Sequence, residues 1–165
     1  MNTLKKEISK LLEREIKEKD LVISGVGKVS RQLFSLRKER EEIPRDFYVQ
    51  GAMGSVFGIG LGLSLYTKKQ VWVLSGEGAL LMKLGSLATI LKYAPKNLHI
   101  VVFDDGHYTS TGGQENNFKY ISNILEKIKE IDFRIVKIKP DKTKPPRPDI
   151  SCKEITKRFR EKVLS

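Results

Sequence analysis

The chain has 165 residues, of which 39% are hydrophobic and 31% charged, and its formal net charge is +11. This length allows one domain with its own core, and the composition excludes a disordered chain and a membrane bundle. The single cysteine, Cys152, excludes a disulfide framework and a multi-cysteine zinc site. The basic start, residues 1–10, lacks the apolar stretch of a signal peptide, so we expect a cytoplasmic protein.

Segments with helical and strand-like periodicity alternate along the chain, which predicts an α/β domain. The predicted helices cover residues 3–19, 29–40, 54–66, 79–93, 118–130 and 151–163. The predicted strands cover residues 21–24, 47–49, 71–74, 98–103 and 133–138. Because the strands are almost continuously apolar, we expect a three-layer α/β/α fold with a mostly parallel central sheet. We expect residues 1–165 to form a single domain, with the proline-containing segment 139–149 crossing its surface.

The basic excess is concentrated in the C-terminal part of the chain, because residues 127–165 alone carry +7. That part contains only two aromatic residues, Phe133 and Phe159. Proteins that bind single-stranded nucleic acid interleave aromatic residues with the charge, so nucleic acid is a poor match. We interpret the excess mainly as a lysine-rich solvated surface, with an acidic partner or nucleic acid as the alternative.

The longest uncharged stretch, residues 47–67, is long enough to span a bilayer. Its glycines and its strand-like start restrict the helical part to residues 54–66, which is too short to span. We therefore expect a buried helix and no membrane segment. This helix and the apolar helix 79–93 offer more apolar surface than one small sheet covers, so we expect them to pack against a partner subunit.

Two acidic residues follow neighbouring strands of the predicted sheet. Glu77 lies between Gly76 and Gly78 at the end of one strand, and Asp105 follows the next strand. The carboxyl ends of parallel strands meet at one edge of a sheet, so we expect both carboxylates within reach of one metal ion. Carboxylates suit Mg²⁺ or Ca²⁺, and the glycines let an anion approach the backbone. A solvated turn with two loop acids is the alternative.

The combined motifs resemble enzymes that use thiamine diphosphate, in which Gly-Asp-Gly is followed by Asn. The resemblance is closest to the phosphonopyruvate and sulfopyruvate decarboxylases, and it includes Gly-Glu-Gly-Ala-Leu-Leu-Met and Ser-Thr-Gly-Gly-Gln. The segments that carry it are 27–34, 51–54, 76–82, 85–90, 94–98 and 110–114. It covers roughly residues 20–160 and implies the diphosphate-binding (PP) domain fold of these enzymes.

The resemblance implies a metal and diphosphate site that holds thiamine diphosphate and Mg²⁺. Glu77 matches the metal-binding Asp, Asp105 matches the metal-binding Asn, and His107 matches the residue that lends a backbone carbonyl. Asp105 adds a negative charge that attracts the cation and repels the diphosphate, and a lysine such as Lys83 is a candidate to offset it. The residues expected around the diphosphate are Gly76, Gly78 and Ala79.

Four further residues take their expected roles from the same resemblance. Gly51 matches the residue whose backbone carbonyl accepts a hydrogen bond from the amino group of the aminopyrimidine. Met53 matches the apolar side chain that holds the cofactor bent, and a methionine in the core is the alternative. Ser110 and Thr111 are loop candidates for contact with the substrate, with simple loop hydrogen bonding as the alternative.

The resemblance implies a subunit of a 2-oxo acid decarboxylase that releases CO₂ and an aldehyde. The anionic substrate would be sulfopyruvate or phosphonopyruvate. Nothing in the chain matches the pyrimidine-binding domain of these enzymes, so we expect an α subunit to carry it in a hetero-oligomer with this β subunit. The alternatives are action on another 2-oxo acid and a non-catalytic binding subunit. A nucleotide-binding module is disfavoured because the sequence lacks a P-loop.

Overall fold

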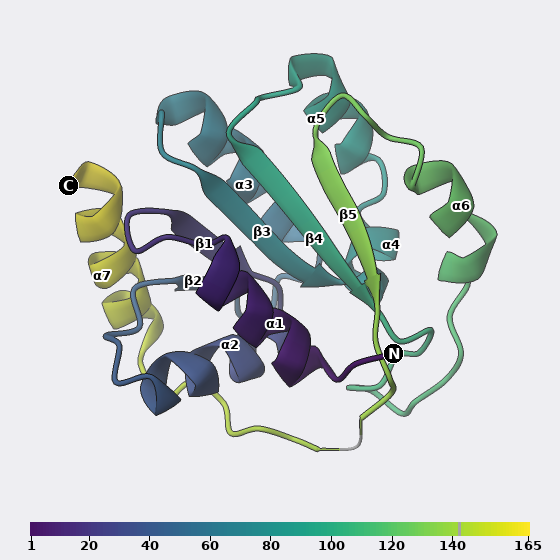
Figure 1. Ribbon diagram of the computed structural model, residues 1–165, viewed down its shortest axis with the longest axis horizontal. Helices are drawn as coiled ribbons and strands as arrows, with labels where there is room; N and C mark the ends of the chain where they lie inside the picture. The colour runs from purple at the N-terminus through teal and green to yellow at the C-terminus, as the bar shows by residue number, and fades with distance from the viewer. Residues whose placement is uncertain (142) are drawn as a thin grey trace.

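The computed structural model describes residues 1–141 and 143–165 and contains a five-stranded sheet (Figure 1). The strands are β1 (Leu21–Ser24), β2 (Phe47–Tyr48), β3 (Val71–Gly76), β4 (Leu98–Asp104) and β5 (Asp132–Lys137). Their order in the sheet is β2-β1-β3-β4-β5, and each neighbouring pair is parallel. The predicted α/β class with a parallel sheet is confirmed.

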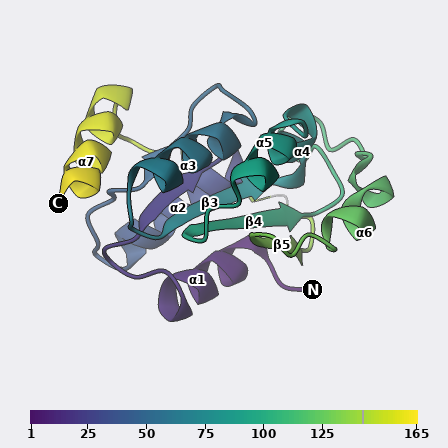
Figure 2. The ribbon, with the colours of Figure 1, turned by 90° about the horizontal axis from the view of Figure 1, so that it is seen from above.

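Helices cover both faces of this sheet, as Figure 2 shows for α1 on one side and for α3 and α5 on the other. The helical segments are α1 (Leu4–Arg14), α2 (Lys28–Glu39), α3 (Ser55–Tyr66), α4 (Glu77–Met82), α5 (Ser86–Tyr93), the 3₁₀ turn η1 (Phe118–Tyr120), α6 (Ser122–Leu125) and α7 (Cys152–Leu164). α1 and α2 share one apolar core, whereas α3, α4 and α5 share the other. α7 packs beside β2 at the edge of the sheet. This is the predicted three-layer arrangement.

Alternate residues of the central strands supply these two cores. In β3, Val71 and Val73 belong to the core under α3, while Trp72 and Leu74 belong to the core under α1 and α2. All four side chains are buried. Burial of a valine or leucine side chain contributes about 1.5–3 kcal/mol, so both faces of the sheet stabilise its position.

The glycines of α3 set how this helix packs. A Cβ atom at Gly60 would clash with Cγ2 of Val73, so only glycine allows α3 to lie this close to the sheet. Gly58 and Gly62 face open space on the other side of the helix. Neither α3 nor any other helix in the described ranges is long and apolar enough to cross a membrane.

The predicted helix 79–93 is interrupted, so this prediction was wrong. α4 starts earlier, at Glu77, and the chain leaves the helix between Met82 and Ser86. Gly85 lies in the break, and glycine is about 1 kcal/mol less favourable than alanine inside a helix. The break separates two short helices whose apolar residues, Leu80 and Ile90, both reach the same core.

Two other predicted helices end early. The segment 118–130 forms only η1 and α6, because several of its amides bond to the carbonyl three residues back, as in a 3₁₀ turn. α1 stops at Arg14, and the amide of Ile16 bonds back to the carbonyl of Leu11, which closes the helix. The described residues of 139–149 form neither helix nor strand, as predicted; residue 142 lies outside the described residues.

The strand order creates a switch point between β1 and β3. From β1 the chain moves outward to β2, and it then crosses back past β1 to reach β3. α2 follows β1 on one face of the sheet, while α4 follows β3 on the other. Connections that diverge in this way leave a crevice at the carboxyl ends of the strands, where ligands bind.

Candidate functional site

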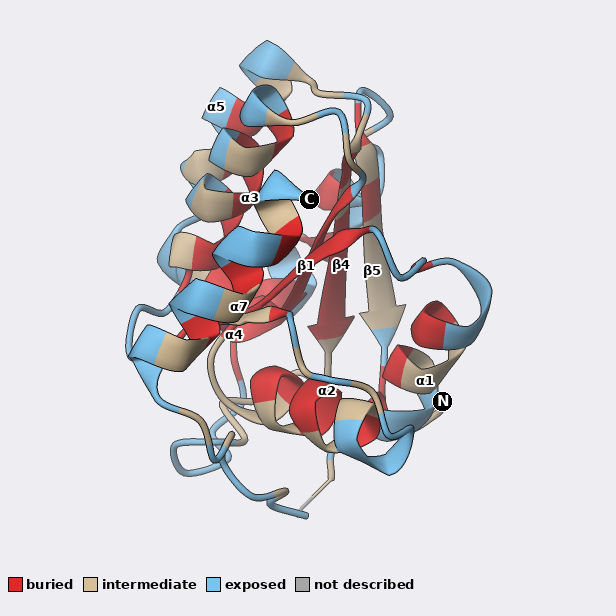
Figure 3. Ribbon diagram, turned by 90° about the vertical axis from the view of Figure 1, so that its left-hand side faces the viewer, coloured by how far each residue is buried: buried red, intermediate tan, exposed pale blue. Residues whose placement is uncertain are grey.

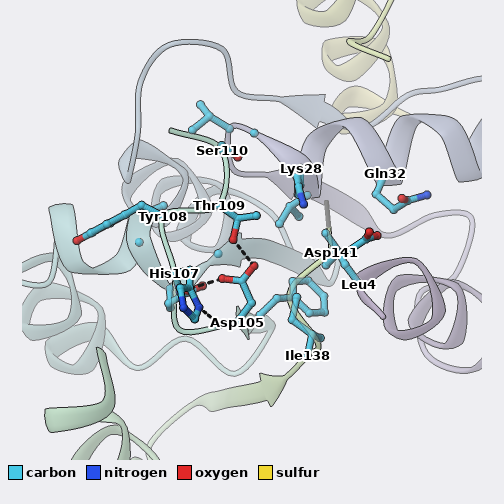
Figure 4. Close-up of a pocket in the computed structure, with 18 of the residues that line it drawn as sticks. Leu4, Lys28, Gln32, Asp105, His107, Tyr108, Thr109, Ser110, Ile138 and Asp141 are labelled. Atoms are coloured by element: carbon cyan, nitrogen blue, oxygen red, sulfur yellow. Dashed lines mark hydrogen bonds between the residues drawn. The ribbon is translucent and has the colours of Figure 1, made fainter. Parts of the chain in front are cut away.

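A cavity of about 490 Å³ lies at the carboxyl ends of β1, β3 and β4 (Figure 4). Its walls come from the turn after β1, the start of α4 and the loop after β4. The predicted site residues that line it are Met53, Gly76, Glu77, Gly78, Ala79, Asp105, His107, Ser110 and Thr111. Gly51 is not among the lining residues. It is exposed in the connection between β2 and α3, with φ of 69°.

Glu77 is the first residue of α4, and only 4% of its surface is exposed. Its Oε1 accepts a hydrogen bond of 2.8 Å from Nδ2 of Asn116. Burial, and after it the negative charge of Asp105, raise the pKa of the Glu77 carboxyl from 4.5 to about 7. A buried carboxylate and a partly buried one that repel each other favour a cation between them, which would lower the pKa of Glu77 again.

Asp105 is held in place by the loop that follows β4. Its Oδ1 accepts a hydrogen bond of 3.0 Å from the backbone N–H of His107, and its Oδ2 accepts one of 2.6 Å from Oγ1 of Thr109 (Figure 4). Nδ1 of His107 lies 2.7 Å from the carbonyl oxygen of Asp105, so this ring nitrogen is the donor. These bonds fix the direction of the Asp105 carboxylate in the ligand-free chain.

Asn116 connects the far end of the same loop to the site. It is 4% exposed, and its backbone N–H donates to the carbonyl of Gly106 at 2.9 Å. Its Oδ1 accepts from the backbone N–H of Phe118, which leaves Nδ2 to hold Glu77. Asn116 and Thr109 are site residues that the sequence analysis missed, because neither belongs to a spaced motif.

Met53 and Tyr108 lie beside Gly78 at the cavity. A Cβ atom at Gly78 would lie 3.0 Å from Cε1 of Tyr108 and 3.4 Å from Cε of Met53. Gly54, with φ of 83°, allows the preceding turn to pack closely on α4, since a Cβ there would lie 2.8 Å from the carbonyl oxygen of Ala79. Met53 is 38% exposed and lines the cavity, so the alternative of a core methionine is wrong.

The site also contains a positive charge that the sequence analysis missed. Lys28 lines the cavity, and its Nζ is buried without a hydrogen-bond partner among the described residues. Lys83, the lysine suggested from the sequence, is exposed and does not line the cavity.

Within residues 1–141 and 143–165, no cluster of three or more His, Cys, Asp or Glu side chains is arranged to hold a metal ion. The cavity therefore offers two carboxylates, and a metal ion there needs further ligands from backbone carbonyls, water or a bound anion. An unpaired lysine, two glycines on the cavity wall and a carboxylate pair fit a cation bound together with a diphosphate.

The family model that matches the chain is described as thiamine pyrophosphate enzyme, C-terminal TPP binding domain, and it covers residues 25–138. Sulfopyruvate decarboxylase subunit beta of Methanothermobacter thermautotrophicus is 34% identical over 167 aligned positions, which cover 88% of each chain. Sulfopyruvate decarboxylase subunit beta of Methanocaldococcus jannaschii is 39% identical over 120 residues, which cover 73% of this chain and 62% of that protein.

A third relative, phosphonopyruvate decarboxylase of Streptomyces hygroscopicus, is 46% identical over 93 residues. This match covers 56% of our chain but only 22% of the Streptomyces protein. The aligned region thus spans less than two thirds of two of these three curated relatives. The family match covers most of the chain and coincides with the cavity-forming strands, and the chain belongs to the thiamine pyrophosphate enzymes through their C-terminal TPP-binding domain.

Proposed function

We propose that this chain is the β, diphosphate-binding subunit of a thiamine diphosphate-dependent 2-oxo acid decarboxylase. The observation that carries the proposal is a pair of carboxylates, the buried Glu77 and the partly buried Asp105, that line one cavity at the carboxyl ends of β3 and β4. Relatives named sulfopyruvate decarboxylase subunit beta and phosphonopyruvate decarboxylase support sulfopyruvate or phosphonopyruvate as the substrate.

In this proposal the chain binds the metal and the diphosphate at the edge of its sheet. Glu77 and Asp105 supply carboxylate oxygens to Mg²⁺, and His107 supplies its backbone carbonyl. When bound, thiamine diphosphate supplies the electron sink that decarboxylation of a 2-oxo acid requires. Gly76, Gly78 and Ala79, at the junction of β3 and α4, form the backbone wall beside the diphosphate.

The remaining residues orient the organic parts of the ligands. The backbone carbonyl of Gly51 accepts a hydrogen bond from the amino group of the pyrimidine, and Met53 supports the bent conformation of the cofactor. The exposure of Met53 at the cavity supports this role, since its side chain is free to touch a ligand. Ser110 and Thr111, exposed on the loop at the cavity wall, are assigned to the substrate.

A second subunit with the pyrimidine-binding domain completes the site in this proposal, while residues 1–165 form the diphosphate-binding domain. The outward side of α3 and α5 is exposed in Figure 3. The C-terminal ends of α3, α4 and α5 and the break between α4 and α5 carry exposed apolar side chains: Leu65, Tyr66, Met82, Leu84 and Tyr93. Exposed apolar residues gathered on one side of a protein favour a protein interface. The open side of α3 at Gly58 and Gly62 leaves room for close contact with a partner.

The test is to co-express the chain with a candidate α subunit and to measure CO₂ release from a panel of 2-oxo acids with Mg²⁺ and thiamine diphosphate. We expect activity with sulfopyruvate or phosphonopyruvate only in the complex, and none from the chain alone. Glu77→Gln in the same complex is the matched inactive control. A complex that assembles and binds the cofactor but decarboxylates no member of the panel would refute the catalytic role and favour a binding subunit.

A further inference from the structure

A buried ammonium group lies in the cavity without a partner. Lys28 is the first residue of α2 and follows the short connection of residues 25–27 after the end of β1. Its Nζ is shielded from solvent and makes no hydrogen bond within the part of the chain that the structure describes. An unpaired buried charge is destabilising, because desolvation is not compensated by any contact. An anion that enters this cavity would remove that cost.

The nearby carboxylates make no hydrogen bond to Nζ of Lys28 within the described residues. Asp141 is close enough to interact with it electrostatically: the hydrogen bonds from Thr143 and, to a smaller extent, the charge of Lys28 lower the pKa of the Asp141 carboxyl. Asp141 lies near Lys28 in Figure 4, but its carboxylate accepts bonds from the backbone N–H and the hydroxyl of Thr143. Asp105 uses both of its oxygens for the loop after β4, as described above. Both acids line the same cavity as Lys28, yet neither makes a hydrogen bond to its Nζ. The positive charge of Lys28 is therefore available to a ligand.

The charges in the cavity suggest which ligand this is. Glu77 and Asp105 are both acidic, whereas the resemblance implies an acid and a neutral amide at these positions. A diphosphate adds several more negative charges, which one divalent cation does not balance. We propose that Lys28 binds the diphosphate group of the cofactor and offsets the negative charge that Asp105 adds to the site. This inference rests on the diphosphate site of the proposed function.

The anionic group of a sulfonate or phosphonate substrate carries oxygen atoms like those of the diphosphate. The position of the metal therefore decides whether Lys28 binds the substrate or the diphosphate. Glu77 and Asp105 share the cavity with Lys28, and a metal ion bound by them draws the diphosphate to this end of the sheet. An ammonium group is a compact charge that binds phosphate well, and a buried one does so with little competition from water.

The first experiment measures binding of inorganic diphosphate with saturating Mg²⁺ to the full chain by calorimetry. Lys28→Met keeps the length and apolar part of the side chain, and we expect it to bind about 10- to 100-fold more weakly, the loss of one charge-assisted contact. Lys28→Arg should stay within a few-fold of wild type. Lys83→Met, which removes an exposed lysine, is the matched control and should bind as wild type does.

The double variant Lys28→Met with Asp105→Asn tests the charge balance. It restores the net charge of the wild-type site, so we expect it to recover part of the affinity that Lys28→Met loses. A merely structural role for Lys28 predicts no such recovery. The ligand-free Lys28→Met chain should melt at or above the wild-type temperature, because the unpaired charge is gone.

Three results would overturn the inference. Unchanged diphosphate affinity together with a lower melting temperature would make Lys28 structural. Unchanged thiamine diphosphate affinity with a raised KM for the 2-oxo acid in the complex would assign Lys28 to the substrate. A wild-type complex of the chain with its α subunit that binds no magnesium diphosphate would remove the diphosphate site, and with it the proposed function as well.

Discussion

Two groups of buried and partly buried charged residues lie in this fold, and they differ in how their charges are balanced. In the first group, Arg37 of α2 donates from Nε to Oδ2 of Asp46 at 2.8 Å and from Nη2 to Oδ1 at 3.0 Å. The hydroxyl of Tyr48 also donates to Asp46, at 3.1 Å. Burial opposes the charge of Arg37, but Asp46 and Glu42 outweigh it and raise the pKa of the guanidinium above its usual value.

The second group, in the cavity, has no such balance. Glu77 and Asp105 carry the same charge, and Lys28 makes no hydrogen bond within the described residues. Arg37 and Asp46 therefore balance each other within the fold, whereas the charges of the cavity residues are left for a ligand to balance. We therefore expect substitutions of Arg37 or Asp46 to change mainly the stability of the domain, and substitutions of the cavity residues to change mainly ligand binding.

The largest effect on stability is expected from breaking the balanced group. Arg37→Met leaves Asp46, whose side chain is 1% exposed, with the Tyr48 hydroxyl but without its ion-pair partner, and we expect a loss of about 3–5 kcal/mol in the free energy of unfolding. Urea denaturation at pH 7 measures it. Lys38→Met, which breaks the exposed pair with Asp149, is the neighbouring control and should leave the midpoint unchanged. Equal midpoints for wild type and Arg37→Met would show that the ion pair of Arg37 and Asp46 does not stabilise the fold.

Glu77→Gln should separate binding from stability. The amide cannot replace a negatively charged metal ligand, so we expect Mg²⁺-dependent thiamine diphosphate binding to weaken at least about 100-fold. The ligand-free variant should be as stable as wild type or more so, because one of two repelling charges is gone and the oxygen near Asn116 remains. Calorimetry and urea denaturation of the same samples measure both properties.

The matched control for this variant is Glu115→Gln, an exposed acid of the same loop that does not line the cavity. It should change neither affinity nor stability. Wild-type affinity in Glu77→Gln would show that the carboxylate pair is not the metal site.

The stability of the ligand-free chain should depend on pH through Glu77. Its folded pKa of about 7 lies above its ordinary value of 4.5, so the folded state holds this proton more tightly than the unfolded state. Stability therefore falls as the pH rises from about 4.5 to about 7, by an amount on the order of 3 kcal/mol. The difference in unfolding free energy between wild type and Glu77→Gln isolates this group. A difference that stays constant from pH 4.5 to 8 would contradict the assignment.

The sequence was sufficient for the sheet and for part of the site, for physical reasons. The strands are apolar on both faces, and parallel strands place Glu77 and Asp105 at the same edge, so a linear pattern predicts both. Asn116 and Lys28 reach the cavity only because a loop closes and α2 begins beside β1, and no residue spacing records that. Lys83, which the sequence suggested as the lysine that offsets the charge of Asp105, lies outside the cavity for a related reason. It lies in the unforeseen break between α4 and α5, where its residue is exposed.

The smallest effect is expected at Met53, and it concerns the shape of the bound cofactor. Met53 is 38% exposed, so Met53→Ala should leave the stability of the ligand-free chain nearly unchanged, unlike a substitution in the core. Glu77 and Asp105 still hold the metal and the diphosphate, so we expect thiamine diphosphate affinity to fall by less than about 2 kcal/mol.

Catalysis should suffer more than binding, because Met53 keeps the amino group of the pyrimidine close to the thiazolium ring, and a small error in position is costly. The measurement is the hydrogen–deuterium exchange rate at the thiazolium C2 position in the reconstituted complex, saturated with cofactor. We expect slower exchange in Met53→Ala, while Ile124→Ala, an exposed apolar residue of α6 outside the cavity, should exchange as wild type does. Wild-type exchange in Met53→Ala at saturation would mean that the side chain touches the cofactor without shaping it.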